Sequence, residues 1–456
     1  MNITKLIAKN TVRFTLLSGL WWSGNISAPF ALTLDQAIQI AQHNDPWQGG
    51  NQLREQALLA QSAAADTLPD PVLSMGMLNL PTNGYALDQE PMTQIKLSVS
   101  QMFPRGDSRT IARRQLELLA GQQPLLGQDR RAQVKVTVST LWLDAYAADK
   151  SIRLLAQERG LFEQLADFVQ TSYSSAQGKT RQQDVVRAQL EIARLQDRLT
   201  LLYEQKDTAL AKLMAWLWAD EPGQQGFESE GQITLNGPLP DIKLPQAASG
   251  LLTSLLNPQQ LANLLTTHPA VQAIQQRIQA GHSSVKLAEQ KYSPQWAVNA
   301  GYAYRQDDQL GRSRADFLSL GVSVSMPIFS TKRQDNDVRA SRLTTESLKT
   351  DQRLLLRNML AQLTALTYQY QRMDQRAELY ANSILPQMHQ QAEASLSAYT
   401  HDDGDFDEVM RARIAEFNGR MEQVTILANR LKIKAQIGYF FSTGTLKPQA
   451  SAGAVE

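Results

Sequence analysis

Residues 318–326 read LSLGVSVSM and residues 95–103 read IKLSVSQMF, and these two stretches decide the fold. In both, large apolar residues alternate with small or polar ones, and Lys96 lies in the polar set. A period of two places the two sets on opposite faces of a β-sheet. The stretches 73–80 and 296–304 alternate in the same way. The sequence therefore predicts four strands that share one apolar face.

Each predicted strand has about nine residues, which is the length that a tilted strand needs to cross a membrane. Aromatic residues gather at the strand ends, as in the interfacial girdle of a membrane barrel: Phe103, Trp296, Tyr304 and Phe317. Four strands cannot close a barrel, because the smallest closed barrels use about eight. An open edge in lipid leaves backbone groups unpaired. If these strands enter a membrane, several copies of the chain must share one barrel.

The chain is internally duplicated. Five short matches recur in the same order, with offsets that stay between 223 and 226 residues. The matched pairs are Asp45 and His268, Pro71 and Pro294, Ser98 and Ser323, Tyr173 and Tyr399, and Asp184 and Glu408. We expect a first repeat over 32–217, an irregular linker rich in Gly and Pro over 218–257, a second repeat over 258–437, and a peripheral tail over 438–456.

Long helices fill the rest of each repeat. Apolar residues recur at four-three spacing, which specifies knobs-into-holes helix packing, over 141–169, 188–213 and 414–435. The segments near 105–175 and 331–400 are each long enough for a helix of about 100 Å. Pro124 and Pro386 predict kinks in them. Each long helix reverses at a polar turn, so the four strands share one end and the two turns share the other.

Composition and charge exclude several classes of protein. The 45 Lys and Arg balance 44 Asp and Glu, so no basic excess indicates a nucleic-acid partner. The chain has no Cys, which excludes thiol catalysis, Cys-ligated zinc and a lipid-modified N-terminal cysteine. No His pair has metal-helix spacing, and we expect no metal site, cofactor or catalytic residue.

The N-terminus predicts export. Lys5, Lys9 and Arg13 precede a short apolar run over 14–22, and small residues follow it. This order is typical of a secretory signal peptide, here residues 1–31. The apolar run is shorter than the roughly 20 residues of a spanning helix. An uncleaved anchor helix is the alternative.

These features together resemble the TolC-type outer-membrane factor family over essentially the whole mature chain. The resemblance rests on the opening LTLDQAIQIAQHNDP, on the two strand pairs, and on SVSQMFPRG against SVSMPIFST at the strand-to-helix junctions. It also rests on the turns YSSAQGKTRQQDVVRAQ and AYTHDDGDFDEVMRAR. Within the family, LPDPVLSMGMLNLP and MTQIKLSVSQMFPRG are similar to the heavy-metal branch, which works with resistance–nodulation–division pumps.

The resemblance implies a mostly α-helical homotrimer with a small membrane β-barrel portion. Each chain would give a duplicated unit of two long heptad helices and two strands. Three chains would form a 12-stranded barrel continued by an α-helical periplasmic tunnel, with the linker as an equatorial belt. The protein would be a non-enzymatic exit duct in the bacterial outer membrane, held there without a lipid anchor. Its partners would be a periplasmic adaptor and an inner-membrane pump, and its cargo metal cations.

Candidate functional residues lie at both ends. Three copies of Asp402, Asp403 and Asp405 would form an acidic ring at the entrance, although turns favour Asp in any case. Lys96 would line the lumen or else form a snorkelling rim charge. The resemblance implies that the turns dock the adaptor, with Gly178, Lys179, Arg181 and Gly404 as candidate contacts.

Two other classes of function stay open. A periplasmic adaptor, or another exported coiled-coil structural protein, also has a long helical hairpin and an export signal. It would have one hairpin between β-rich halves, not two strand pairs each set between helices. A periplasmic enzyme would need a convergent acid–base or nucleophile set, and the sequence shows none.

Overall fold

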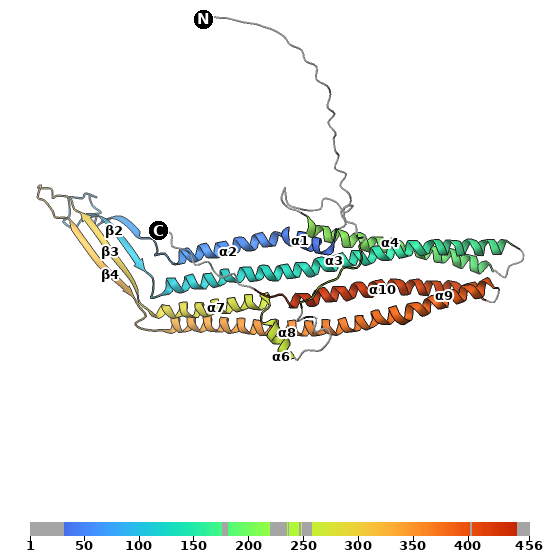
Figure 1. Ribbon diagram of the computed structural model, residues 1–456. Helices are drawn as coiled ribbons and strands as arrows, with labels where there is room; N and C mark the ends of the chain where they lie inside the picture. Colours follow the sequence, from blue (N-terminus) through green and yellow to red (C-terminus); the bar gives the residue numbers. More distant parts are fainter. Residues whose placement is uncertain are drawn as a thin grey trace, which may run out of the picture.

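The computed structural model describes residues 32–175, 181–218, 235, 237–245, 248, 258–401 and 404–444. The expected signal peptide, most of the expected linker and the last part of the tail lie outside these residues. The described residues form an elongated molecule in which long helices run side by side and a small sheet stands at one end (Figure 1). The helix ends that flank the two expected turns lie at the opposite end, as the sequence predicts.

Both halves of the chain run through the same order of elements. The first half contains α1 (Leu34–His43), α2 (Pro46–Ala65), β1 (Val72–Leu78), β2 (Gln94–Phe103), α3 (Ser108–Ser174) and α4 (Gln182–Leu217). The second contains α6 (Pro258–Leu265), α7 (Pro269–Glu289), the short η2 (Gln290–Tyr292), β3 (Gln295–Tyr304), β4 (Phe317–Ser325), α8 (Lys332–Leu379), the π-helical η3 (Tyr380–Ile384), α9 (Leu385–Thr400) and α10 (Phe406–Phe440).

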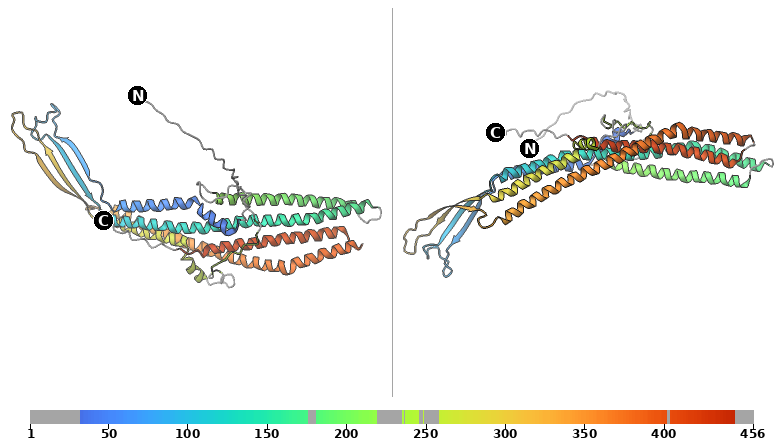
Figure 2. Two further views of the ribbon diagram at one scale, coloured as in Figure 1. Left: turned by 45° about the horizontal axis from the view of Figure 1, so that its top comes forward. Right: turned by 90° about the horizontal axis from the view of Figure 1, so that it is seen from below.

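The four strands form a single antiparallel sheet in the order β1-β2-β3-β4. Leu97 of β2 lies opposite Met75 of β1 and Tyr302 of β3, and Tyr302 lies opposite Leu318 of β4. This register keeps the predicted apolar residues on one face, because side chains alternate strictly along each strand. The strands begin and end within two residues of the predicted positions. The sheet leans away from the helix axis (Figure 2).

Helix α3 is 67 residues long and runs without interruption through Pro124. Pro124 therefore lies inside one continuous helix, and the expected kink there stays a prediction. Side chains of α2 donate to the carbonyl groups around it: Asn51 Nδ2 to Gln123 O at 2.7 Å and Gln48 Nε2 to Gly127 O at 3.0 Å. In the second half, by contrast, the π-helical turn η3 separates α8 from α9 immediately before Pro386. A single π turn of this kind marks a local irregularity in a helix.

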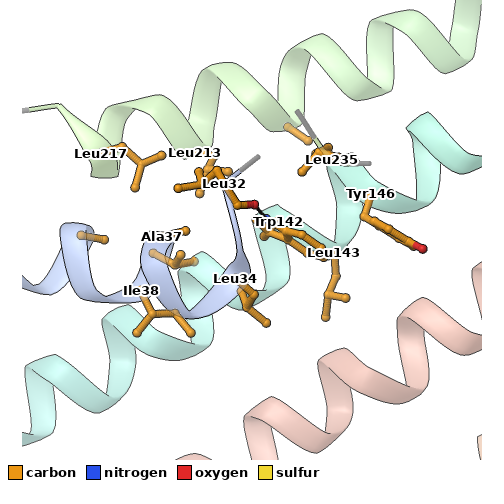
Figure 3. Close-up of a cluster of buried hydrophobic side chains, with 14 of the residues drawn as sticks. Leu32, Leu34, Ala37, Ile38, Trp142, Leu143, Tyr146, Leu213, Leu217 and Leu235 are labelled. Atoms are coloured by element: carbon orange, nitrogen blue, oxygen red, sulfur yellow. Dashed lines mark hydrogen bonds between the residues drawn. The ribbon is translucent and has the colours of Figure 1, made fainter. Parts of the chain in front are cut away.

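Apolar side chains at the predicted heptad positions form the core. One cluster joins α1, α3 and α4, where Trp142 stacks on Tyr146 and donates from Nε1 to Leu32 O at 3.4 Å (Figure 3). A second cluster runs along α3, α4 and α10 and includes the fully buried Phe162 and Phe417. A third joins α6, α8 and α10. The core is therefore a set of helix-to-helix seams rather than one central globule.

Candidate functional site

One face of the sheet exposes a continuous apolar surface. Leu320 is 76% exposed and Met75 is 77% exposed in the single chain. Their apolar neighbours on this face are also exposed: Leu73, Met77, Leu97, Val99, Trp296, Val298, Tyr302, Tyr304, Leu318, Val322 and Val324. A surface of this size marks a contact with another apolar phase, either lipid or a partner protein.

The opposite face carries small and polar side chains. Ser74, Ser98, Asn299 and Ser323 lie on this face. Its other residues are also small or polar, apart from a few apolar residues near the strand ends. Lys96 also lies here, between Gly76 of β1 and Ala303 of β3. The two faces thus differ in chemistry along the strands, apart from their ends.

The two outer strands of the sheet are open. β1 pairs only with β2 and β4 only with β3 among the described residues. An unpaired strand edge offers a row of backbone N–H and C=O groups to another chain. In a membrane such an edge must be paired, since each unsatisfied group costs several kcal/mol.

Arginine side chains tie the two hairpin loops together at the end of the sheet that points away from the helices. Arg314 donates to Asp88 O at 3.3 Å and to Glu90 O at 3.1 Å. Arg305 donates to Pro91 O at 3.2 Å and lies over the ring of Phe317. The loop of the second strand pair therefore holds the loop of the first.

The helical tip carries the other sequence-predicted residues. Gly178, Lys179, Asp402 and Asp403 lie outside the described residues. Arg181, Gly404 and Asp405 are described, and all three are exposed at the tip. The backbone N–H of Arg181 donates to Asp184 Oδ2 at 2.8 Å and so begins α4.

Gly404 is needed for space rather than for an unusual backbone angle. A Cβ atom there would stand 2.8 Å from Tyr399 N and 3.0 Å from Ala398 C. Its φ is not in the left-handed region, which Gly106 and Gly311 occupy. From the sequence, Gly404 is a candidate adaptor contact. The structure adds that the close return of the chain onto α9 leaves no room for a side chain there.

A buried ionic cluster on α10 is the feature that sequence reasoning missed. Glu416 is 4% exposed and accepts from Arg413 at 3.1 Å, Arg420 at 2.5 Å and His389 of α9 at 2.9 Å. Arg420 also donates to Glu158 of α3 at 2.9 Å. Burial raises the pKa of the Glu416 carboxyl, but hydrogen bonds from His389, Arg420 and Arg413 outweigh it and leave the pKa below its usual range. The only signal in the sequence was the spacing of Arg413, Glu416 and Arg420 on one helix face.

The two halves start their second helix with different capping residues. Asp45 Oδ1 accepts from Trp47 N at 3.2 Å at the start of α2, while His268 Nδ1 accepts from Ala270 N at 3.2 Å at the start of α7. His268 Nε2 then faces Tyr439 O at 3.1 Å, so the ring is neutral with its proton on Nε2. Burial lowers the pKa of His268 despite the carboxylate of Asp129 nearby. His268 therefore caps α7 and links the start of this helix to α10.

Among the described residues, no helix has an apolar stretch long enough to cross a membrane. Within the same ranges, no group of three His, Asp or Glu side chains is placed to hold a metal ion.

The geometry defines a helical shaft that ends in an open sheet with one apolar face, and solved outer-membrane channels have this architecture. No protein-family model and no curated protein sequence matches the chain. CusC is similar with a TM-score of 0.70 and 14% identity, over 90% of this chain and 92% of that chain. The CmeC outer-membrane channel of Campylobacter jejuni is similar with a TM-score of 0.70 and 10% identity, over 95% of this chain and 94% of that chain.

The outer-membrane protein VceC of Vibrio cholerae is similar over 90% of this chain and 96% of that chain, with a TM-score of 0.70 and 13% identity. These identities are low, so the likeness establishes the fold alone. The chain has the TolC-type outer-membrane channel fold: mostly helical, with four antiparallel strands.

Proposed function

We propose that this chain is a subunit of an outer-membrane exit channel that conducts solutes passively and catalyses no reaction. The observation that carries the proposal is the sheet, which combines one exposed apolar face with two unpaired edges at one end of long helical hairpins. Lipid would cover the apolar face, and neighbouring copies would pair the edges. Three copies would supply 12 strands, and α3 alone spans about 100 Å, enough for a tunnel deep into the periplasm.

The proposed assembly is a homotrimer that receives cargo from an inner-membrane pump through a periplasmic adaptor. The helical tip is where the adaptor would bind, with Arg181 and Gly404, together with Gly178 and Lys179, as the candidate contacts. Both described residues are exposed there. We further propose that residues 32–217 and 258–437 are two repeats joined by a linker over 218–257. We also propose that residues 1–31 are a signal peptide and that the protein is anchored without a lipid.

Metal cations are the proposed cargo. The support is the similarity of the sequence around the first strand pair to the heavy-metal branch. Expression in a host that lacks its own outer-membrane exit channel, with the cognate pump and adaptor, should raise the tolerated concentration of a transition metal. Unchanged metal tolerance alongside raised drug tolerance would refute the metal assignment and keep the channel.

Membrane fractionation followed by the mass of the detergent-solubilised mature protein tests the assembly. We expect the protein in the outer-membrane fraction, with a protein mass three times that of one mature chain. The reason is that only a shared barrel pairs both strand edges. A soluble periplasmic monomer would overturn the channel and favour the alternative, a periplasmic adaptor or other exported coiled-coil structural protein.

We propose an acidic ring at the periplasmic entrance, formed by Asp402, Asp403 and Asp405 of three copies. Changing all three to Asn should lower cation conductance in planar bilayers about twofold or more, because fixed negative charge concentrates cations at a pore mouth. A matched control is Glu422→Gln on the side of α10, where Arg376 neutralises the carboxylate at 2.7 Å. Equal conductance and ion selectivity in the triple variant and the control would exclude the ring.

A further inference from the structure

The small-residue face of the sheet carries one charged side chain within the strands. The residues that face the same way on β1, β3 and β4 are Val72, Ser74, Gly76 and Leu78; Gln295, Ala297, Asn299, Gly301 and Ala303; and Phe317, Ser319, Gly321, Ser323 and Ser325. On β2 they are Gln94, Lys96, Ser98, Ser100 and Met102. Lys96 is therefore the single charge of the strand residues on this face.

The glycines on the neighbouring strands leave room for the side chain of Lys96. A Cβ atom on Gly301 would stand 2.9 Å from Lys96 Cε, so the missing side chain of Gly301 leaves room for the lysine to lie across β3. Gly76 on the other neighbouring strand also lacks a side chain. Lys96 is half-buried against this backbone, whereas the neighbouring Leu97 on the apolar face is exposed. The lysine therefore belongs to the small-residue face rather than to the lipid-facing one.

No carboxylate neutralises this lysine inside the described part of the chain. Lys96 takes part in no ion pair with the described residues. A neighbouring copy would not supply a carboxylate from its strands either. Its β4 would pair with β1, and the small-residue face of β4 contains only Phe317, Ser319, Gly321, Ser323 and Ser325. In any register of that pairing, the strands of the trimer would thus bring no carboxylate to the face on which Lys96 lies.

Lys96 lies near the outer end of the sheet. It is the third residue of β2, which begins at Gln94 after the first hairpin loop. This places it about 7 Å from the start of the strand. The loops at this end point away from the helices (Figure 2). In the proposed trimer, Lys96 would lie in the outer third of the lumen, far from the proposed acidic ring at the helical tip.

We propose that three Lys96 side chains form a positively charged ring that selects for anions at the outer end of the lumen. The inference rests on the proposed trimeric channel. The ring raises the local concentration of small anions and of solutes with net negative charge, and it disfavours bare cations, because fixed charge on the wall of the lumen acts over about a Debye length. Transport driven by the pump then carries cationic cargo past the Lys96 ring. The ring also reduces the leak of free cations into the lumen from outside.

The test is the ratio of anion to cation permeability for the purified trimer in planar bilayers, with a KCl gradient at about 0.1 M ionic strength. Lys96→Gln should shift the Cl⁻/K⁺ permeability ratio toward K⁺ about twofold or more, and Lys96→Glu should shift it further in the same direction. Both shifts should shrink at 1 M salt, where the Debye length is about 3 Å. Because Gln and Glu are close to Lys in length, neither variant opens a cavity.

Lys291→Gln is the matched control. It removes the same charge at the helix end of the sheet, where Asp337 already pairs with Lys291 at 2.8 Å, and its ratio should equal that of the wild type. A conducting trimer whose ratio is the same in all four proteins overturns the ring and leaves the channel intact. Failure of the wild-type protein to form a trimer or to conduct overturns both proposals.

Discussion

Leu320→Arg is expected to abolish assembly of the protein in the outer membrane. Leu320 is 76% exposed near the middle of β4, on the apolar face, opposite Ala300. An Arg at the midplane of a membrane barrel costs about 2–4 kcal/mol, and a trimer carries the change three times. The expected total of about 6–12 kcal/mol is comparable with the whole stability of a domain. The measurement is the amount of heat-resistant trimer in the outer-membrane fraction.

Gly321→Arg is the matched control for this variant. Gly321 is the next residue of the same strand and faces the other way, and a Cβ atom there would meet no atom within 4 Å. Both variants add the same charge to the same strand. We expect trimer from Gly321→Arg at near wild-type amounts and almost none from Leu320→Arg. Equal loss in both variants would contradict the distinction between the faces, and loss only in Gly321→Arg would mean that the small-residue face contacts lipid.

The sheet could be predicted from the sequence because the pattern that defines each strand is local. Alternation along one strand fixes which side chains share a face, so Leu318 to Val324 and Trp296 to Tyr302 could be assigned without knowing which strand lies beside which. The heptad seams are local in the same sense, and Phe162 and Phe417 are buried where the four-three spacing places them. These patterns also indicated that strands and turns occupy opposite ends.

Long-range pairing is what the sequence could not supply. Asn51 and Gln48, which donate to carbonyl groups of α3 on either side of Pro124, are about 70 residues or more away along the chain. Arg314 holds the carbonyl groups of Asp88 and Glu90 across the two halves. No spacing rule links such residues, because each contact forms only after the helices and strands have packed. The candidate tip residues were predicted from the acidic cluster of one turn and from the family resemblance, and the structure describes only some of them.

The ionic cluster around Glu416 carries the second large expected effect. Glu416→Ala should lower the free energy of unfolding by about 3–5 kcal/mol, because it leaves Arg413 and Arg420 without their shared acceptor. Arg413 is itself 9% exposed, and its remaining partner is the exposed Glu393. The measurement is denaturant unfolding of the solubilised protein followed by circular dichroism. Glu422→Ala on the same helix breaks the exposed pair with Arg376 and should cost about 1 kcal/mol or less.

A second variant separates lost charge from lost packing at Glu416. Replacing Glu416 and Arg413 together by Leu removes both buried charges, and it should recover much of the loss, since apolar replacements of buried ion pairs are often neutral. If the double variant is as unstable as Glu416→Ala, the cluster stabilises through shape, and the electrostatic account is wrong.

The pH dependence of the unfolding free energy is an independent test of the same cluster. The pKa of the Glu416 carboxyl is lower in the folded protein than in the unfolded chain. The stabilisation that the Glu416 carboxylate contributes is therefore complete at pH values above the ordinary pKa range of carboxyl groups. It is lost as the pH falls through the pKa of the folded protein. Glu416→Gln cannot titrate, so its unfolding free energy should fall less than that of the wild type upon acidification. Since this cluster joins α9, α10 and α3 beside the π-helical turn η3, it fixes α9 at the point where the second hairpin is least regular.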